Sequence, residues 1–369
     1  MKKNIPFFKY SAVYAENKKA YTKVLEDVLE RGAFILQRDL SEFEKNLAEY
    51  LGQKYAFGIA NATDGLMMAL RLAGLKAGDE VILPSHTFVA TAAAVHFVGG
   101  VPVLVECGGD HLIDVDEAKK SVTSKTKVIM PVQLNGRTCN MDQVNAFAKN
   151  YGLKIVEDSA QGLGSKFKGR LAGTFGVAGT FSFYPAKILN CFGDGGAIVV
   201  DQDGYAEALH QMRDHGRNTK GDIVSWGLNS RLDNLQAAIL NIKLKSFDEA
   251  ISYRRKLADV YEKTLGDLKQ VKLPPAPDAD TNHFDTYQNY EIEAQKRNEL
   301  QAFLKEEGIG TLIQWGGKPL HQLNSLGLNA TLPYTDELFK KCLMLPMNTL
   351  ITEEDVAYVC QKIRTFYKA

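Results

Sequence analysis

The chain has 369 residues, with 44 basic and 44 acidic side chains, a formal net charge of zero and 45% hydrophobic residues. These are the proportions of a globular protein large enough to bury a core without disulfide or metal staples. Zero net charge argues against a nucleic-acid protein held by bulk phosphate attraction, because such binding needs a basic face, so we expect no nucleic-acid partner.

Cysteine usage and the N-terminal residues predict the cellular compartment. The five cysteines are widely spaced and form no C-x-x-C pair, which is typical of free thiols in a reducing environment. The first residues, MKKNIPFFKYSAVYAENKK, contain no apolar core of a signal peptide. No apolar run approaches the ~20 residues that a membrane-spanning helix needs. We therefore expect a soluble cytoplasmic protein with no membrane partner.

The first part of the chain alternates helical and strand patterns. Apolar residues at helical spacing predict helices over residues 15–31 and 40–51, which end at Gly32 and Gly52. The next predicted elements, in chain order, are strand 55–60, helix 64–75, strand 81–83, helix 88–97, strand 101–105, helix 115–122, strand 127–130, helix 141–151 and strand 153–156. Strands separated by single helices are typical of a mostly parallel sheet covered on both faces.

Beyond residue 175 the pattern changes. The predicted elements there are strands 179–184 and 197–200, helix 204–212, a polar loop 214–231, a long helix 232–265, strand 287–292 and helices 298–307 and 352–366. The segment Lys272-Leu-Pro-Pro-Ala-Pro-Asp278 is the strongest turn signal in the chain. We expect an α/β fold with a large domain over residues 1–247 and a smaller C-terminal α+β domain over residues 248–369.

Several common cofactor and metal motifs are missing from the sequence. It contains no G-x-x-x-x-G-K-[ST] phosphate loop and no complete G-x-G-x-x-G pattern. The seven histidines include no H-x-x-x-H or H-E-x-x-H pair. We therefore expect neither metal catalysis nor the common form of NAD chemistry.

Asp158 is the first of three features that lie where ligand sites of open α/β sheets form. It ends the predicted buried strand in the stretch LKIVEDSAQ, residues 153–161. A carboxylate in such a place needs a cationic partner to stay ionised. The alternative is that Asp158 caps the helix that follows it.

The other two features are a lysine and a helix start. Lys187 lies between an apolar strand and a glycine cluster, in GTFSFYPAKILNCFGDGG. It either extends to solvent or is buried with a lowered pKa, as an imine-forming amine requires. Asn61-Ala-Thr-Asp-Gly65 lies between a strand and a helix, where backbone N–H groups can bind phosphate. The same residues could be a plain N-cap.

An amine, a carboxylate and a helix N-terminus are together what pyridoxal 5'-phosphate (PLP) requires. The chain resembles the DegT/DnrJ/EryC1/StrS family of sugar aminotransferases, fold-type-I PLP enzymes related to aspartate aminotransferase. The resemblance covers nearly the whole chain. The motifs that carry it are Ile5-Pro-Phe with Gly32-Ala-Phe-Ile-Leu36, Asn61-Ala-Thr-Asp-Gly65, residues 78–91 (GDEVILPSHTFVAT), Glu157-Asp-Ser-Ala-Gln161, Phe181-Ser-Phe-Tyr-Pro-Ala-Lys187, Gly193-Asp-Gly-Gly196 and Gly227-Leu-Asn-Ser-Arg-Leu-Asp233.

The resemblance implies an aspartate aminotransferase-like fold and a role for each matching residue. Lys187 would join the cofactor and carry the substrate proton, and Asp158 would keep the pyridine nitrogen protonated. Asn229 would reach the phosphate of a neighbouring subunit, which implies a homodimer with shared active sites. The other implied cofactor contacts are Thr63, Asp64 and Ser182 at the phosphate, Gln161 at the ring hydroxyl, and Phe88 on the ring face, where Phe88 could also be simple core.

The implied reaction is a ping-pong transfer. L-Glutamate would leave its amino group on the cofactor, as pyridoxamine 5'-phosphate, and a keto-sugar, usually nucleotide-linked, would receive it. Lys187 separates the chain from the related sugar 3-dehydratases, in which histidine replaces that lysine. Three alternatives stay open: a PLP-dependent dehydration or elimination on a sugar, amination of a keto-sugar without a nucleotide, and a non-catalytic PLP-binding regulator.

The substrate side departs from the family pattern. Amides stand at Gln133, Gln288 and Gln314 where the family often has histidine, which removes titratable groups and keeps hydrogen-bonding capacity. Trp315 and Lys318 could hold a ring and an anionic group of the acceptor, or be core packing and a solvated charge. These departures leave the identity of the keto-sugar open. The candidate substrate contacts are Phe34, Gln133, Asn135, Trp315, Lys318 and His321.

Overall fold

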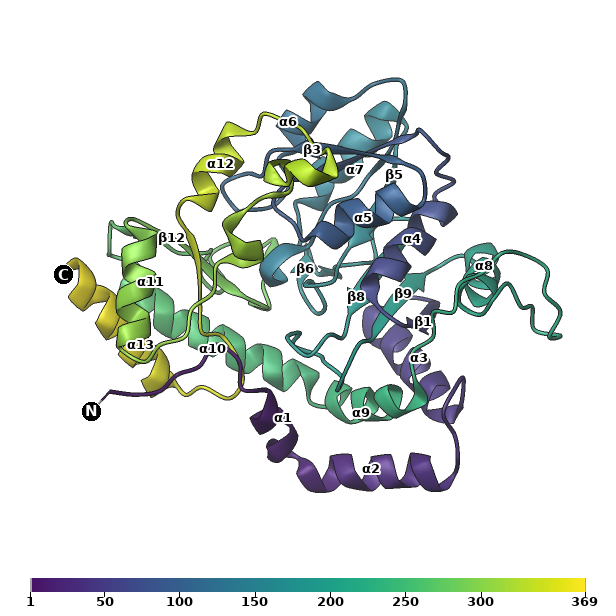
Figure 1. Ribbon diagram of the computed structural model, residues 1–369, viewed down its shortest axis with the longest axis horizontal. Helices are drawn as coiled ribbons and strands as arrows, with labels where there is room; N and C mark the ends of the chain where they lie inside the picture. Colours follow the sequence, from purple (N-terminus) through teal and green to yellow (C-terminus); the bar gives the residue numbers. More distant parts are fainter. Residues whose placement is uncertain (1, 369) are drawn as a thin grey trace.

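The computed structural model describes residues 2–368 and contains a sheet of seven strands in the order β1-β9-β8-β5-β4-β2-β3 (Figure 1). Strands β8, β5, β4, β2 and β3 pair in parallel, while β9 runs antiparallel to both of its neighbours, β1 and β8. The expected α/β class with a mostly parallel sheet is confirmed. The strands are β1 (Tyr55–Ile59), β2 (Glu80–Pro84), β3 (Val101–Val105), β4 (Thr126–Ile129), β5 (Lys154–Asp158), β8 (Ala178–Ser182) and β9 (Gly196–Val200).

Helices cover both faces of this sheet, which explains why its strands are almost continuously apolar. On β9, Ile198 and Val200 pack into a core with Leu66 and Leu209, while Val199 points into a second core. Successive residues of β9 therefore point to opposite faces of the sheet and pack into different cores, as expected for a strand. The covering helices are α3 (Arg38–Leu51), α4 (Ala62–Leu72), α5 (Val89–Phe97), α6 (Val115–Ala118), α7 (Met141–Tyr151) and α8 (Asp203–Arg213).

The C-terminal part has its own antiparallel sheet in the order β10-β12-β13. Its core joins Leu257, Ile292 and Val359, and Ile5 from the start of the chain packs into the same core. The proline-rich stretch after residue 272 follows directly on β10, so it lies within this part of the molecule. The elements are α10 (Phe247–Leu265), β10 (Val271–Lys272), β12 (Tyr290–Ala294), α11 (Arg297–Glu306), α12 (Pro333–Phe339), β13 (Cys342–Leu345) and α13 (Glu353–Tyr367).

Two predicted helices are each divided in the structure. The helix expected over 15–31 is α1 (Tyr10–Glu16) and α2 (Lys18–Glu30), separated at Asn17, whose ψ is 37°. The helix expected over 232–265 is α9 (Asn234–Leu244) and α10, separated at Ser246, whose ψ is 19°. Neither break carries a glycine or proline. In the second case α9 packs against α3 and α2, whereas α10 packs against α13, so tertiary contacts place the break.

Some short elements were not predicted. The sequence did not predict β13, which has four residues, or α12, which has seven, because such short segments show little apolar periodicity. A small sheet in the order β11-β6-β7 pairs residues 166–171 with residues 283–284, with β6 (Lys166–Phe167), β7 (Arg170–Leu171) and β11 (His283–Phe284). Over residues 2–368, no helix is both long and apolar enough to traverse a bilayer.

Candidate active site

A cavity of about 560 Å³ lies at the carboxyl ends of β5 and β8 and at the N-terminal ends of α4 and α5. This is the edge at which an open α/β sheet forms its ligand sites. Segments far apart in the sequence therefore meet at one place. The predicted cofactor residues that line the cavity are Thr63, Phe88, Asp158, Gln161, Ser182 and Lys187.

Asp158 ends β5 with its side chain facing the cavity and only 5% of the residue exposed. Its Oδ2 accepts a hydrogen bond from Thr91 Oγ1 at 2.8 Å, and its Oδ1 accepts one from the Ala160 N–H at 3.2 Å. Burial raises the pKa of Asp158, while these hydrogen bonds and the nearby Lys187 charge lower it. No helix begins after Asp158, because the chain continues through turns to β6. The helix-cap alternative therefore does not describe this residue.

Lys187 lies in the irregular segment between β8 and β9 and lines the same cavity. Burial lowers the pKa of its amine to about 8, and the Asp158 charge acts in the opposite direction. Gln288 holds the peptide groups on both sides of Lys187: its Nε2 donates to the Ala186 carbonyl at 2.8 Å and its Oε1 accepts from the Ile188 N–H at 2.8 Å. Gln288 also lines the cavity. The sequence marks Gln288 as a departure from the family pattern, but only the fold shows that it contacts the segment of Lys187.

The N-terminus of α4 forms another wall. Asn61 caps the helix by accepting a hydrogen bond from the Asp64 N–H at 2.9 Å, and Thr63 lines the cavity. The first N–H groups of a helix have no partner within it, and they carry the positive end of the helix dipole. Gly65 lets this helix approach β8, since a Cβ there would lie 2.5 Å from Thr180 Cγ2. Asp64 is not among the residues that line the cavity.

Phe88 and Gln161 present free surface to the cavity. Phe88 is 54% exposed, so it is not a core residue of this chain. Gln161 Oε1 accepts hydrogen bonds from the Asn135 N–H at 2.9 Å and from Asn289 Nδ2 at 3.0 Å, which leaves its amide nitrogen unused in these contacts. The two residues thus offer an aromatic face and an N–H donor to a bound ring.

Three predicted site residues are exposed at the surface of this chain. Asn229 is exposed and bridges to Asp214 at the base of the loop that connects α8 to α9. Phe34 is 47% exposed, and Lys318 is also exposed. None of Phe34, Lys318 or Asn229 lines the cavity within this chain.

Two predicted substrate contacts, Gln133 and His321, are buried and already bonded. Gln133 Nε2 donates to Glu157 Oε2 at 2.7 Å, and Gln133 Oε1 accepts from the Cys139 N–H at 2.7 Å. His321 Nδ1 pairs with Ser85 Oγ at 2.8 Å, and its Nε2 pairs with Asp336 Oδ1 at 2.9 Å. Neither side chain lines the cavity. Both hold neighbouring loops together.

Of the predicted substrate contacts, Trp315 alone lines the cavity, while Asn135 lies behind Gln161. The side chain of Asn135 bonds to Gln314, Asn289 and Glu291. Two further lining residues, Tyr184 and Asp194, belong to the family motifs at residues 181–187 and 193–196, and the sequence predicts no role for them. The motifs therefore contain more of the residues that line the cavity than the predicted site residues alone.

The cavity brings together an anion-binding helix end, a buried carboxylate and an amine of lowered pKa. PLP carries a phosphate, a basic ring nitrogen and an aldehyde that reacts with amines, so these three groups fit it. The raised pKa of Asp158 supports this fit, because a buried carboxylate with only a weak cationic neighbour gains from a cationic ring nitrogen. The fold and the site thus define a PLP-dependent enzyme of fold type I.

Comparison with known proteins gives the family. The model of the DegT/DnrJ/EryC1/StrS aminotransferase family matches residues 15–364, and the chain belongs to this family. The protein is therefore a PLP-dependent sugar aminotransferase, and the expected family, enzyme class and cofactor are confirmed.

Full-length relatives include enzymes that act on nucleotide sugars. The chain is 36% identical to UDP-2-acetamido-2-deoxy-3-oxo-D-glucuronate aminotransferase of Pseudomonas aeruginosa, with 91% of this chain and 93% of the relative covered. It is 35% identical to dTDP-3-amino-3,4,6-trideoxy-alpha-D-glucose transaminase of Streptomyces venezuelae, with 98% and 95% covered. It is also 38% identical to the pleiotropic regulatory protein of Geobacillus stearothermophilus, with 99% of each covered.

Solved structures agree with this assignment. DesV of S. venezuelae, in complex with a ketimine intermediate, superposes with a TM-score of 0.94 at 34% identity, covering 99% of both chains. NtdA of Bacillus subtilis, with bound pyridoxamine 5'-phosphate, superposes with a TM-score of 0.86 at 29% identity, covering 97% of this chain and 85% of the other.

Proposed function

We propose that this protein transfers the amino group of L-glutamate to the keto group of a nucleotide-linked sugar during amino-sugar biosynthesis. The proposal rests on one observation: Lys187, Asp158 and the N-terminus of α4 all line one cavity of about 560 Å³. The UDP- and dTDP-linked substrates in the names of two relatives support a nucleotide on the acceptor.

Lys187 and Asp158 are proposed to have different roles in this reaction. When bound, PLP supplies an electron sink that lets a substrate carbon lose a proton. Lys187 Nζ is proposed to hold the cofactor and to move that proton, and its pKa of about 8 leaves more neutral amine near pH 7 than an ordinary lysine has. Asp158 is proposed to hold the ring nitrogen in its protonated form.

The remaining proposed contacts hold the cofactor at its edges. The hydroxyls of Thr63 and Ser182 and the first N–H groups of α4 bind the phosphate. Phe88 covers a face of the ring, and Gln161 donates to the ring hydroxyl. Trp315, which lines the cavity, is proposed to contact the acceptor sugar.

We propose a homodimer that shares its active sites. The loop between α8 and α9 extends away from the sheet (Figure 1, teal) and exposes Ile223 by 70%, Val224 by 55% and Trp226 by 93%. A cluster of exposed apolar side chains on one loop is typical of a protein-binding surface. Asn229 at the base of this loop would then be free to reach the cofactor of the neighbouring subunit.

We also propose that the enzyme works in the cytoplasm. All five cysteines are free and buried, which fits a reducing compartment.

A half-reaction assay separates the donor from the acceptor. PLP-loaded protein is expected to lose its visible absorbance with L-glutamate and to regain it with the correct keto-sugar. L-Glutamine serves as the alternative donor, and a panel of keto-sugars with and without a nucleotide tests the acceptor. Consumption of a sugar without any donor would favour elimination or dehydration. Absence of amino transfer to every acceptor would favour the regulatory role that the name of one relative suggests.

A further inference from the structure

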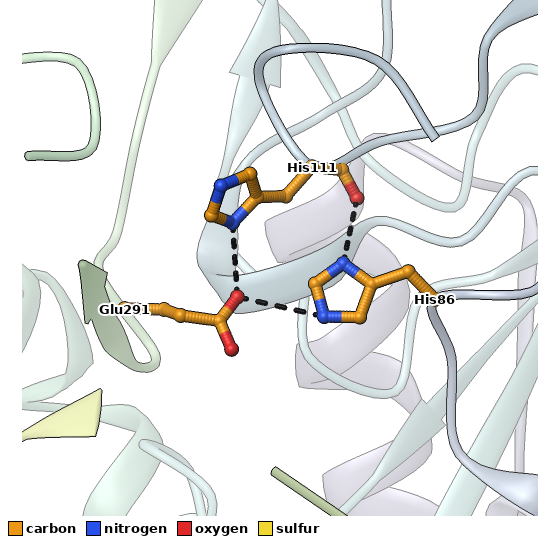
Figure 2. A group of neighbouring side chains, drawn as sticks. All are labelled: His86, His111 and Glu291. Atoms are coloured by element: carbon orange, nitrogen blue, oxygen red, sulfur yellow. Dashed lines mark hydrogen bonds and ion pairs between the residues drawn. The ribbon is translucent and has the colours of Figure 1, made fainter. Parts of the chain in front are cut away.

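A buried group of two histidines and a glutamate lies outside the PLP cavity (Figure 2). His86 follows β2, His111 lies in the loop after β3, and Glu291 is on β12. We refer to these three residues as the His-His-Glu cluster. One possible ligand atom from each residue can be chosen so that all lie within 4.8 Å of one another. Short histidine motifs do not reveal this cluster, because its three residues come from segments that are distant in the sequence.

One ring nitrogen of each histidine points at the same carboxylate oxygen. His111 Nδ1 lies 2.9 Å from Glu291 Oε2, and His86 Nε2 lies 3.5 Å from it (Figure 2). Two ligands of a tetrahedral zinc ion, each bonded at about 2.0–2.1 Å, are about 3.3 Å apart. The two observed separations fall on either side of this value, so small side-chain movements would admit an ion.

The second nitrogen of each ring faces an acceptor. His86 Nδ1 lies 3.3 Å from the His111 carbonyl oxygen, and His111 Nε2 lies 3.4 Å from Glu293 Oε1. For His86, the carbonyl acceptor favours a proton on Nδ1, which turns the lone pair of Nε2 toward Glu291. His111 has a carboxylate beside each ring nitrogen, and a metal ion would take the place of the proton on its Nδ1. Metal-binding histidines are oriented in this way by acceptors behind them.

Two atoms of the cluster lack a hydrogen-bond partner although they are buried. They are His86 Nε2 and Glu291 Oε1, in residues that are 0% and 2% exposed. With its proton on Nδ1, His86 presents a lone pair to a carboxylate, which is unfavourable in a dry interior. His86 Nε2 faces Glu291 Oε2, which also accepts a hydrogen bond from Asn135 Nδ2 at 3.1 Å, and a cation between Nε2 and the carboxylate would satisfy the histidine.

The cluster also has room beside it. His111 and Glu291 line a separate cavity of about 260 Å³, which would admit an ion and leave space for a water ligand. We propose that the His-His-Glu cluster binds a divalent transition-metal ion of the zinc type through His86 Nε2, His111 Nδ1 and the Glu291 carboxylate. Because Glu291 belongs to the C-terminal sheet and the histidines follow strands of the large sheet, the ion would join these two parts of the fold. This proposal is independent of the proposed donor and acceptor.

Zinc binding can be measured directly on the PLP-loaded protein. After equilibrium dialysis against micromolar zinc chloride, elemental analysis is expected to give about one zinc per chain at this site. Glu291→Gln and His86→Gln are each expected to weaken binding at least about 10-fold. His321→Gln is the matched control, because it removes another buried histidine bonded to a carboxylate outside the cluster, and it should bind zinc like the original chain. Equal binding by all variants would overturn the proposal.

A second measurement needs no variant and so does not depend on variant folding. Zinc-edge X-ray absorption of the original protein is expected to show two imidazole ligands and oxygen donors. A spectrum without imidazole, or no stoichiometric zinc after dialysis, would show that His111 and Glu291 form only an ion pair. Thermal unfolding gives a further check: zinc should raise the Tm of the original chain and leave that of Glu291→Gln unchanged.

Discussion

The Lys187 amine and the Asp158 carboxylate are common ionisable groups whose behaviour is set by where the chain buries them. Burial lowers the pKa of Lys187 to about 8 and raises the pKa of Asp158. Each shift favours the neutral form, and each group partly offsets the shift of the other. The sequence identified both residues from their motifs, but the direction of each pKa shift could only come from their surroundings.

The lowered pKa of Lys187 predicts the pH dependence of cofactor loading. The neutral amine attacks the PLP aldehyde, so the rate of recombination of the apoenzyme with PLP should rise with pH and reach half its maximum near pH 8. Stopped-flow absorbance gives this rate. In Asp158→Asn the midpoint should move to lower pH, because the carboxylate charge raises the pKa of Lys187. A rate that still increases at the pKa of an ordinary lysine, about 10.4, would refute the argument.

Asp158→Asn also tests the proposed support of the ring nitrogen. The amide keeps the size of the side chain and can still accept a hydrogen bond from Thr91, so the fold should be retained. Removing the charge should lower kcat at least about 100-fold. Steady-state kinetics, with circular dichroism as the check on folding, give the answer. Near-normal turnover would exclude a role for this charge.

Gln288 is predicted to position Lys187 through the two peptide groups that flank it. Gln288→Ala removes both hydrogen bonds and should lower kcat about 10- to 100-fold with a smaller change in KM. Gln288→His retains one donor and one acceptor and should restore part of the activity. Equal kcat losses in both variants, or a change in KM alone, would contradict a positioning role.

At the scale of elements, α4 and β8 meet closely at Gly65, and this contact sets the position of the helix N-terminus at the cavity. A Cβ at Gly65 would lie 2.5 Å from Thr180 Cγ2 and 2.6 Å from Ile59 Cδ1. Gly65→Ala should therefore destabilise the protein by about 1–3 kcal/mol through overpacking. It should also weaken PLP binding by displacing the helix end.

Gly204→Ala provides the control for this prediction. Gly204 is also a helical glycine near the start of its helix, α8, but a Cβ there would have no neighbour within 4 Å. This substitution should stabilise the protein by up to about 1 kcal/mol. Urea unfolding measures both free energies, and equal effects in the two variants would contradict the packing argument.

The regular alternation of strands and helices over residues 55–158 was predictable, because each element there has its own apolar period. The breaks at Asn17 and Ser246 were not predictable, since neither segment contains a residue that ends a helix. They occur where the chain leaves one set of packing partners for another. The short β13 became recognisable only once its pairing with β12 was visible.

At the scale of the whole molecule, we propose that the chain divides near residue 247 into a large α/β domain and a smaller α+β domain. The core around Leu257, Ile292 and Val359 and the core around Leu66 and Ile198 lie mainly on opposite sides of this position, which supports the division, although Leu320 and Leu332 pack into the second of these cores. In the opposite direction, Ile5 of the N-terminal segment forms an isolated bridge to Ile309 and packs into the core around Leu257. The start of the chain thus stabilises the C-terminal core.

The proposed dimer predicts the effect of removing a large apolar side chain from the exposed loop between α8 and α9. In a symmetric dimer each Trp226 would be buried once, and burial of a large apolar side chain contributes about 1.5–3 kcal/mol. Trp226→Ser should therefore raise the dimer dissociation constant about 10²- to 10⁴-fold. Sedimentation velocity over a range of protein concentrations measures this. Phe97→Ser, at a residue that is 70% exposed elsewhere, should leave the constant unchanged.

The sequence by itself determined the family, the cofactor and the central lysine and aspartate, because these follow from local motifs that lie next to apolar strands. Only the tertiary structure decided which candidate side chains reach the cavity: Trp315 does, while Gln133 and His321 are held by interior hydrogen bonds. The tertiary structure alone also revealed the His-His-Glu cluster, whose three residues are far apart in the sequence. Orientation and hydrogen-bond satisfaction depend on partners far away in the chain, and a one-dimensional pattern does not contain them.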